Sequence, residues 1–78
     1  MSSNIVHQYF KKDTAEGKIL VKLNPIQLKG TELFIPITGP VESRNLTFDE
    51  HILEDLSADG FEETGPLEFS LYLTGLAR

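Results

Sequence analysis

The segment TFDEHILEDLSADGF, from Thr47 to Phe61, constrains the fold more than any other part of the chain. Thr47 and Glu50 have the spacing of a capping box, in which each side chain accepts a hydrogen bond from the other residue's backbone N–H. Gly60 suits the left-handed position that ends many helices, and Phe61 then completes a Schellman motif. A start signal and a stop signal therefore predict a helix over residues 48–58.

This predicted helix is amphipathic, so it requires a partner surface. Apolar Phe48, Ile52 and Leu56 recur every four residues, and Leu53 widens the same stripe. A short helix with such a narrow apolar stripe is not stable alone in water. We therefore expect a sheet elsewhere in the chain, with the helix packed on one of its faces.

Four other segments have the composition and alternation of strands, and they cover residues 5–11, 18–23, 31–38 and 67–74. The turn-forming link DTAEG predicts that the first two strands form an antiparallel hairpin. Pro36 within the third strand indicates an edge position or a bulge, because proline has no N–H for the ladder.

The last of these segments, LEFSLYLT, alternates most regularly. Leu67, Phe69, Leu71 and Leu73 would share one face, and polar residues together with Tyr72 would occupy the other. We expect the helix to pack on the leucine-rich face. Residues 61–66 are predicted to form a turn.

These elements predict a small α+β domain with the order β-β-β-α-β and a mainly antiparallel four-stranded sheet. One helix would cover one face of the sheet. A small closed or half-closed barrel with a helical plug is the alternative. Residues 41–46 are expected to form a polar connection, with room for a short strand at 41–43.

The 78 residues are expected to form a single domain over residues 1–78. The chain has no cysteine, so neither disulfides nor thiolate metal sites can stabilise it. We find no apolar signal-peptide core and no apolar run of the roughly 20 residues that a membrane span needs. A cytoplasmic protein without membrane contact is therefore expected.

Charge is distributed unevenly along the chain, whose net charge is −5. Residues 1–41 carry a net +2, and residues 42–78 carry nine acidic residues against two arginines, a net −7. The acidic half would repel a nucleic-acid backbone, so nucleic acid is not expected as a partner. The lysines near Tyr9 and Phe10 could accompany base stacking, but we interpret them as charges that protect strand edges.

Two patterns in the predicted helix resemble metal sites. His51, Glu54 and Asp55 have i+3 and i+4 spacings, so imidazole and carboxylate could meet around a divalent ion. Structural sites usually need four ligands, and no cysteine or nearby histidine supplies more. The run DLSADG also matches the first half of a calcium loop, but its twelfth position is Pro66, so we interpret it as a helix end.

Catalytic patterns are absent from the sequence. His7 and His51 are the only histidines, and neither a G-x-S-x-G motif nor a phosphate-binding loop occurs. We therefore expect a protein that is not an enzyme and that needs no cofactor.

The function that these observations favour is a small non-enzymatic protein-interaction or accessory domain with an acidic helical face. The predicted interaction residues are Asp49, Glu50, Glu54, Asp55, Glu62 and Glu63. A protein partner is expected, either a basic protein or a second copy that pairs along the edge of the first or third strand. The alternative is a divalent-metal or small-ligand binding protein that uses the cluster of His51, Glu54 and Asp55.

Overall fold

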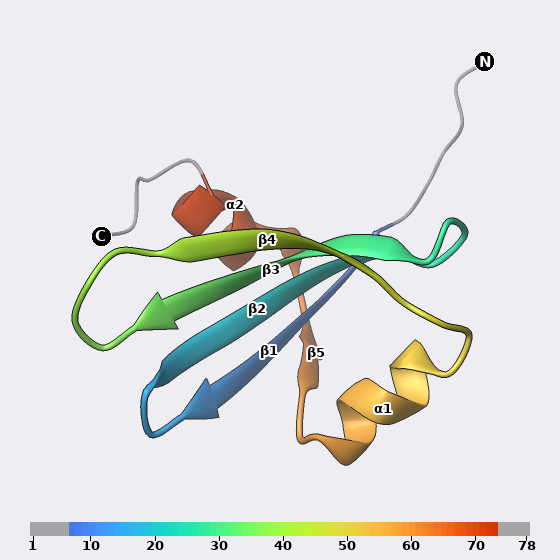
Figure 1. The fold of residues 1–78 in the computed structure, drawn as a ribbon, viewed down its shortest axis with the longest axis horizontal. Coiled ribbons are helices and arrows are strands. Elements are labelled where there is room, and N and C mark those ends of the chain that lie inside the picture. Colours follow the sequence, from blue (N-terminus) through green and yellow to red (C-terminus); the bar gives the residue numbers. More distant parts are fainter. Residues whose placement is uncertain (1–6, 74–78) are drawn as a thin grey trace.

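The computed structural model of the chain describes residues 7–73, with five strands and two helices (Figure 1). In chain order, these elements are β1 (Gln8–Thr14), β2 (Gly17–Asn24), β3 (Lys29–Pro36), β4 (Glu42–Thr47), α1 (Ile52–Ala58), β5 (Glu62–Thr64) and α2 (Pro66–Leu73). The strands form one antiparallel sheet in the order β4-β3-β2-β1-β5.

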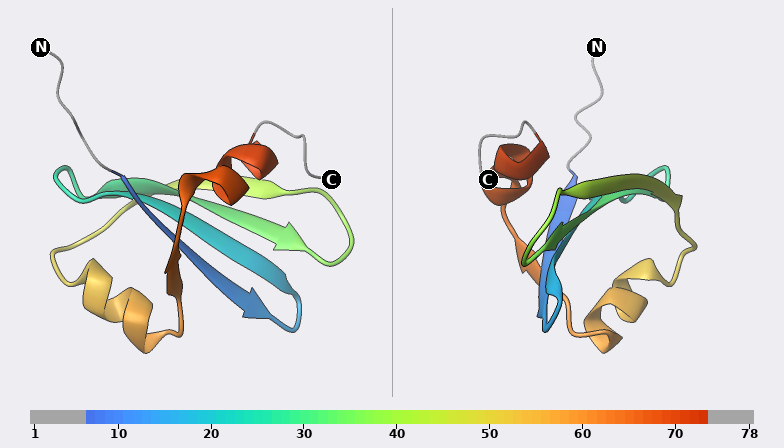
Figure 2. Two further views of the ribbon diagram at one scale, coloured as in Figure 1. Left: turned by 180° about the vertical axis from the view of Figure 1, so that it is seen from behind. Right: turned by 60° about the vertical axis from the view of Figure 1, so that its left-hand side comes forward.

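The chain passes from one edge of this sheet to the other through α1. Strands β1 to β4 form a meander, each pairing with the next. Helix α1 then leads from β4 to β5, which pairs with β1 at the opposite edge. Figure 2 shows α1 and α2 on opposite sides of the sheet, so the described chain has three layers.

The tight β1–β2 turn requires glycine at position 17. Thr14 donates a hydrogen bond from Oγ1 to the carbonyl oxygen of Gly17 at 2.8 Å, which closes the turn. A Cβ atom on Gly17 would lie only 2.3 Å from the carbonyl oxygen of Ile35 on β3. Only glycine therefore allows the turn to lie so close to the third strand.

Each face of the sheet has its own core. The α1-side core consists of Phe10, Val21, Leu23 and Leu56, with Ile19, Phe48, Ile52 and Phe61 packed against it. The α2-side core consists of Leu20, Leu33 and Phe69, with Tyr9, Ile35 and Tyr72 packed against it. Because side chains alternate along β2, this strand contributes to both cores.

The sequence predicted the α1 segment only in part. The helix is confirmed, but it begins at Ile52, and the predicted capping box is wrong. Thr47 is the last residue of β4, where it pairs with Lys29, so its side chain does not cap the helix. Instead, Asp49 accepts a hydrogen bond through Oδ1 from the backbone N–H of His51 at 2.9 Å.

The predicted end of α1 is confirmed. Gly60 has a left-handed φ of 88° and donates its N–H to the carbonyl oxygen of Ser57 at 3.1 Å. Phe61 donates its N–H to the carbonyl oxygen of Leu56 at 2.9 Å. These two bonds form the Schellman motif, and Phe61 packs against the same core as Leu56.

The prediction for the C-terminal segment is wrong. Residues 66–73 form helix α2 instead of a strand, and position 74 lies outside the described residues. The residues predicted as a turn before it include strand β5. Phe69 packs on the side of the sheet opposite α1, so the expected contact between the first helix and the Phe69 face does not form.

The predicted α+β class and the mainly antiparallel sheet are confirmed, but the numbers of elements are not. The sheet has five strands instead of four: the segment predicted as the last strand is helix α2, strand β4 covers most of the polar connection predicted at 41–46, and residues 62–64 are β5. It does not close into a barrel, since β4 and β5 are its two ends. Within residues 7–73, neither helix has the length and apolar composition of a membrane span.

The expectation about which strands lie at the sheet edges also changes. The first and third strands, which we expected to offer an edge to a second copy, are inner strands: β1 lies between β2 and β5, and β3 between β2 and β4. The edges are β4, with six residues, and β5, with three. Edge pairing with a second copy would therefore have to use one of these strands.

Candidate interaction surface

Exposed carboxylates gather around α1 and β5. The six predicted interaction residues Asp49, Glu50, Glu54, Asp55, Glu62 and Glu63 are all exposed. Asp59, at the C-terminal end of α1, is a seventh exposed carboxylate that the sequence analysis did not include, because we assigned it only to the helix end. We call these seven residues the acidic surface.

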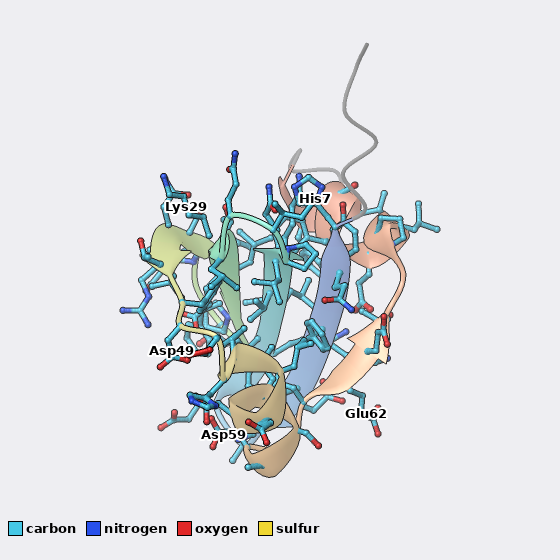
Figure 3. The ribbon with its side chains drawn as sticks, turned by 90° about the vertical axis from the view of Figure 1, so that its right-hand side faces the viewer. His7, Lys29, Asp49, Asp59 and Glu62 are labelled. Carbon is cyan, nitrogen blue, oxygen red and sulfur yellow. The ribbon has the colours of Figure 1, made fainter. Side chains whose placement is uncertain are left out.

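The acidic surface follows α1 and continues onto the neighbouring strand. Figure 3 shows Asp49 and Asp59 beside α1, and Glu62 on β5 next to it. Lys29 lies at the end of the sheet away from Asp59 and Glu62 (Figure 3). The seven carboxylates come from one short stretch of sequence along α1 and into β5, where Glu63 lies opposite Phe10 on the α1 side of the sheet and Glu62 lies opposite Lys11 on the other side.

The stretch itself supplies no positive charge to this surface, and the nearest lysines are Lys11 and Lys12 of β1, which line a hollow together with Glu62 at its β5 end. The stretch from Asp49 to Glu63 contains no lysine or arginine. Within residues 7–73, the ion pairs that involve lysine or arginine are Lys18–Glu68 and Arg44–Glu32, both outside the acidic surface. Carboxylates this close together create a negative potential that salt screens beyond about 10 Å at 0.1 M ionic strength.

Two lysines lie at the border of the acidic surface: Lys11 pairs with Glu62 across β1 and β5, and Lys12 follows it. The Nζ atom of Lys12 lies 5.7 Å from the centre of the Phe61 ring, directly before β5. This cation–π geometry places the ammonium group against an aromatic face instead of against a carboxylate. The contact leaves the net charge of the surface strongly negative.

The structure brings together two of the three predicted metal ligands. His51 Nδ1 lies 3.1 Å from Glu54 Oε1, and both side chains are exposed. Asp55 does not join them: among residues 7–73, no three His, Asp or Glu side chains are close enough to hold one ion. Asp55 and Ser57 lie within α1, in agreement with our interpretation of the calcium-like run as a helix end.

The second histidine lies elsewhere. His7 is half-buried directly before β1, and Figure 3 places it beyond the end of the sheet, away from Asp59 and α1. The two histidines of the chain are therefore in different surroundings, and they do not form a common site.

Exposed carboxylates of this kind accept hydrogen bonds from lysine and arginine, and such charge-assisted bonds are about twice as strong as neutral ones. The arrangement is thus suited to recognise positive charge spread over a surface. Comparison of the chain with protein-family models, curated proteins and solved structures finds no match.

Proposed function

We propose that this chain is a small non-enzymatic protein-interaction domain that binds a basic segment of another protein through the acidic surface. The observation that carries the proposal is the set of seven exposed carboxylates between Asp49 and Glu63, a stretch without lysine or arginine. A partner rich in lysine or arginine would neutralise this charge, and electrostatic attraction would also accelerate the encounter.

The position of the surface supports a protein partner over a nucleic acid. Phosphate groups would meet the same negative potential that attracts lysine and arginine. The acidic surface is also carried by α1 and β5: α1 contributes Leu56 to the α1-side core, and β5 pairs with β1, whose Phe10 belongs to the same core. A rigid support of this kind fixes the carboxylates relative to one another before a partner arrives, which reduces the entropic cost of binding.

The test is a titration of the ¹⁵N-labelled chain with a ten-residue peptide that contains five lysines separated by glycines. We expect amide shifts within residues 49–63 and an affinity that falls as salt is added. In a triple variant, Glu50→Gln, Glu54→Gln and Asp55→Asn remove three charges from the acidic surface. Its affinity should fall roughly tenfold, because surface ion pairs contribute about 0.2–1 kcal/mol each and 1.4 kcal/mol is a factor of ten.

The matched control removes three exposed carboxylates outside residues 49–63, through Asp13→Asn, Glu16→Gln and Glu42→Gln; of these, Asp13 borders Glu62. This variant has the same net charge as the first triple variant, so a general charge effect would weaken both equally. Equal weakening, or shifts centred outside residues 49–63, would contradict a dedicated acidic surface.

Metal binding is the second candidate function, and the contact between His51 and Glu54 is the observation that favours it. Titration with Zn²⁺, Mn²⁺ or Ca²⁺ tests it on the same labelled chain. Shifts confined to residues 50–56 at micromolar metal, lost in the His51→Ala variant, would support this candidate. Unchanged spectra would leave the protein-interaction proposal as the better explanation of the acidic helix.

A further inference from the structure

A hollow of about 260 Å³ lies beside the acidic surface, where the β2–β3 turn faces the start of α1. Its lining consists of Leu23, Pro25, Ile26, Leu28, Glu50, Ile52 and Leu53. All of these residues except Glu50 are apolar. The hollow is thus an apolar depression with a carboxylate in its wall.

Hydrogen bonds fix the turn that forms one wall. The buried Asn24 accepts hydrogen bonds through Oδ1 from the backbone N–H groups of Ile26 and Gln27, both at 3.0 Å. Leu28 adopts a left-handed φ of 57°, and its carbonyl oxygen accepts the N–H of Phe48 at 2.7 Å. The turn is therefore tied to the segment that leads into α1, and the two walls are held at a set separation.

Two large apolar side chains remain uncovered in this lining. Ile26 is 73% exposed and Leu53 is 46% exposed. Our sequence analysis assigned Leu53 to the buried stripe of the helix, but the structure places it at this hollow instead. Single exposed apolar residues are ordinary, whereas neighbouring ones around a depression are typical of a binding site.

The charge around the hollow indicates what covers it. Glu50 is part of the lining, Asp49 precedes it in the chain, and Glu54 directly follows Leu53, whereas the turn side carries one cation, Lys29, directly after Leu28. A second copy that docked with its own α1 would bring carboxylates against carboxylates, which is unfavourable. A basic segment with one apolar side chain would instead satisfy both the apolar lining and the adjacent negative charge.

We propose that the hollow receives one apolar side chain, such as leucine, isoleucine or phenylalanine, from the basic partner segment, and that the flanking lysines or arginines contact the acidic surface. The proposal rests on the proposed function and adds the feature that would make the interaction selective for a segment with an apolar side chain. The hollow has about 260 Å³, which is less than the roughly 300–1,000 Å³ of pockets for drug-sized molecules. Its size therefore suits a single side chain.

Two peptides test the inference. Both have ten residues and five lysines, and they differ only at a central position, which is leucine in one and serine in the other. We expect the leucine peptide to bind roughly tenfold more tightly, because burial of an apolar side chain adds to the charge attraction. It should also shift the methyl signals of Ile26, Leu28 and Leu53, which the serine peptide should leave in place.

The variant Ile26→Ser should remove the advantage of the leucine peptide and leave the binding of the serine peptide unchanged. Because Ile26 is mostly exposed, this substitution is not expected to affect folding. Ile37→Ser is the matched control, since Ile37 is 74% exposed and lies outside the lining of the hollow. The control variant should retain the full preference for leucine.

The outcomes separate the two proposals. Equal affinities for the two peptides, with shifts within residues 49–63, would overturn the side-chain site and leave the acidic interaction domain intact. Failure of both peptides to bind would overturn the proposed function and the inference with it. A dimer in sedimentation equilibrium that Ile26→Ser dissociates would assign the hollow to a second copy and overturn the inference.

Discussion

Helix α1 and helix α2 cover opposite faces of the same sheet, but they are held there by different interactions. Helix α1 contributes Leu56 to its core and ends in a Schellman motif that also directs Phe61 against the sheet. Helix α2 contributes Phe69 and is further connected to β2 by the ion pair between Lys18 and Glu68.

The difference shows two ways in which a helix can be specified. The C-terminal end of α1 is determined locally, because the bonds of Gly60 and Phe61 form within the segment itself. Helix α2 depends more on what it packs against: the rings of Phe69 and of Tyr9 on β1 form a T-shaped pair with a centroid distance of 5.7 Å. We therefore expect substitutions at the α2 contact to have the larger effect on stability.

The largest expected effect is that of Phe69→Ala. It should lower the free energy of unfolding by about 3–5 kcal/mol, and Leu56→Ala on α1 should lower it by about 2–5 kcal/mol. Urea denaturation measures both. Failure of Phe69→Ala to fold would agree with this expectation, because a chain of 78 residues has little stability to lose.

Leu67→Ala is the control for this comparison, because Leu67 lies in the same helix and is 71% exposed, whereas Phe69 is 2% exposed. Its effect should stay below about 0.5 kcal/mol, as for most surface substitutions. Similar losses for Leu67→Ala and Phe69→Ala would place both side chains on one buried face, as in the strand predicted from the sequence, and would contradict helix α2.

The same two residues explain why the sequence predicted α1 better than α2. Residues two apart share a face in a strand but lie about 200° apart around a helix, so only the helix separates exposed Leu67 from buried Phe69. The alternation of apolar and polar residues in this segment matches a strand, so we expected Leu67 and Phe69 to share a face. Two signals for a helix were present: Pro66, which suits the first helical position, and Glu68 in the first turn.

The candidate site also has one part that could be predicted from the sequence and one part that could not. The acidic surface could be predicted from the sequence, because a run of carboxylates without lysine or arginine is exposed in almost any fold. The hollow could not, since it joins Ile26 and Leu53 from separate segments and depends on the left-handed turn at Leu28. Strand β5 was missed because its three residues, EET, have no apolar alternation.

A smaller effect is expected at the end of α1. Gly60→Ala should cost about 1–2 kcal/mol, because an L-residue strains the left-handed backbone. The new Cβ would have room, since its nearest neighbour is the Cε atom of Lys12 at 4.0 Å. Urea denaturation should show this loss, but no loss for the control Gly65→Ala, whose Cβ would meet nothing within 4 Å. Equal effects would mean that the Schellman motif does not hold α1 in place.

The smallest effect is expected at the ion pair of α2, where Lys18→Met should cost about 1 kcal/mol or less at pH 7. The hydrogen bond to Glu68 raises the pKa of Lys18 above its ordinary 10.5, burial opposes the shift, and the charges of Glu68, Tyr72 and Asp13 add to it. Folding therefore favours the protonated amine, and its contribution is complete below pH 10.5 and disappears as the pH rises past the raised pKa.

Denaturation of the wild-type chain and of Lys18→Met at several pH values between about 7 and 11.5, a range that brackets the titration of lysine, measures this contribution. The difference between the two chains should be constant up to about pH 10 and then shrink. Glu68→Gln should produce the same loss at pH 7, and the double variant should lose little more, because either change breaks the same pair. Additive losses would mean that α2 is held by Phe69 and Tyr72 without help from charge, which would remove the electrostatic difference between the two helices.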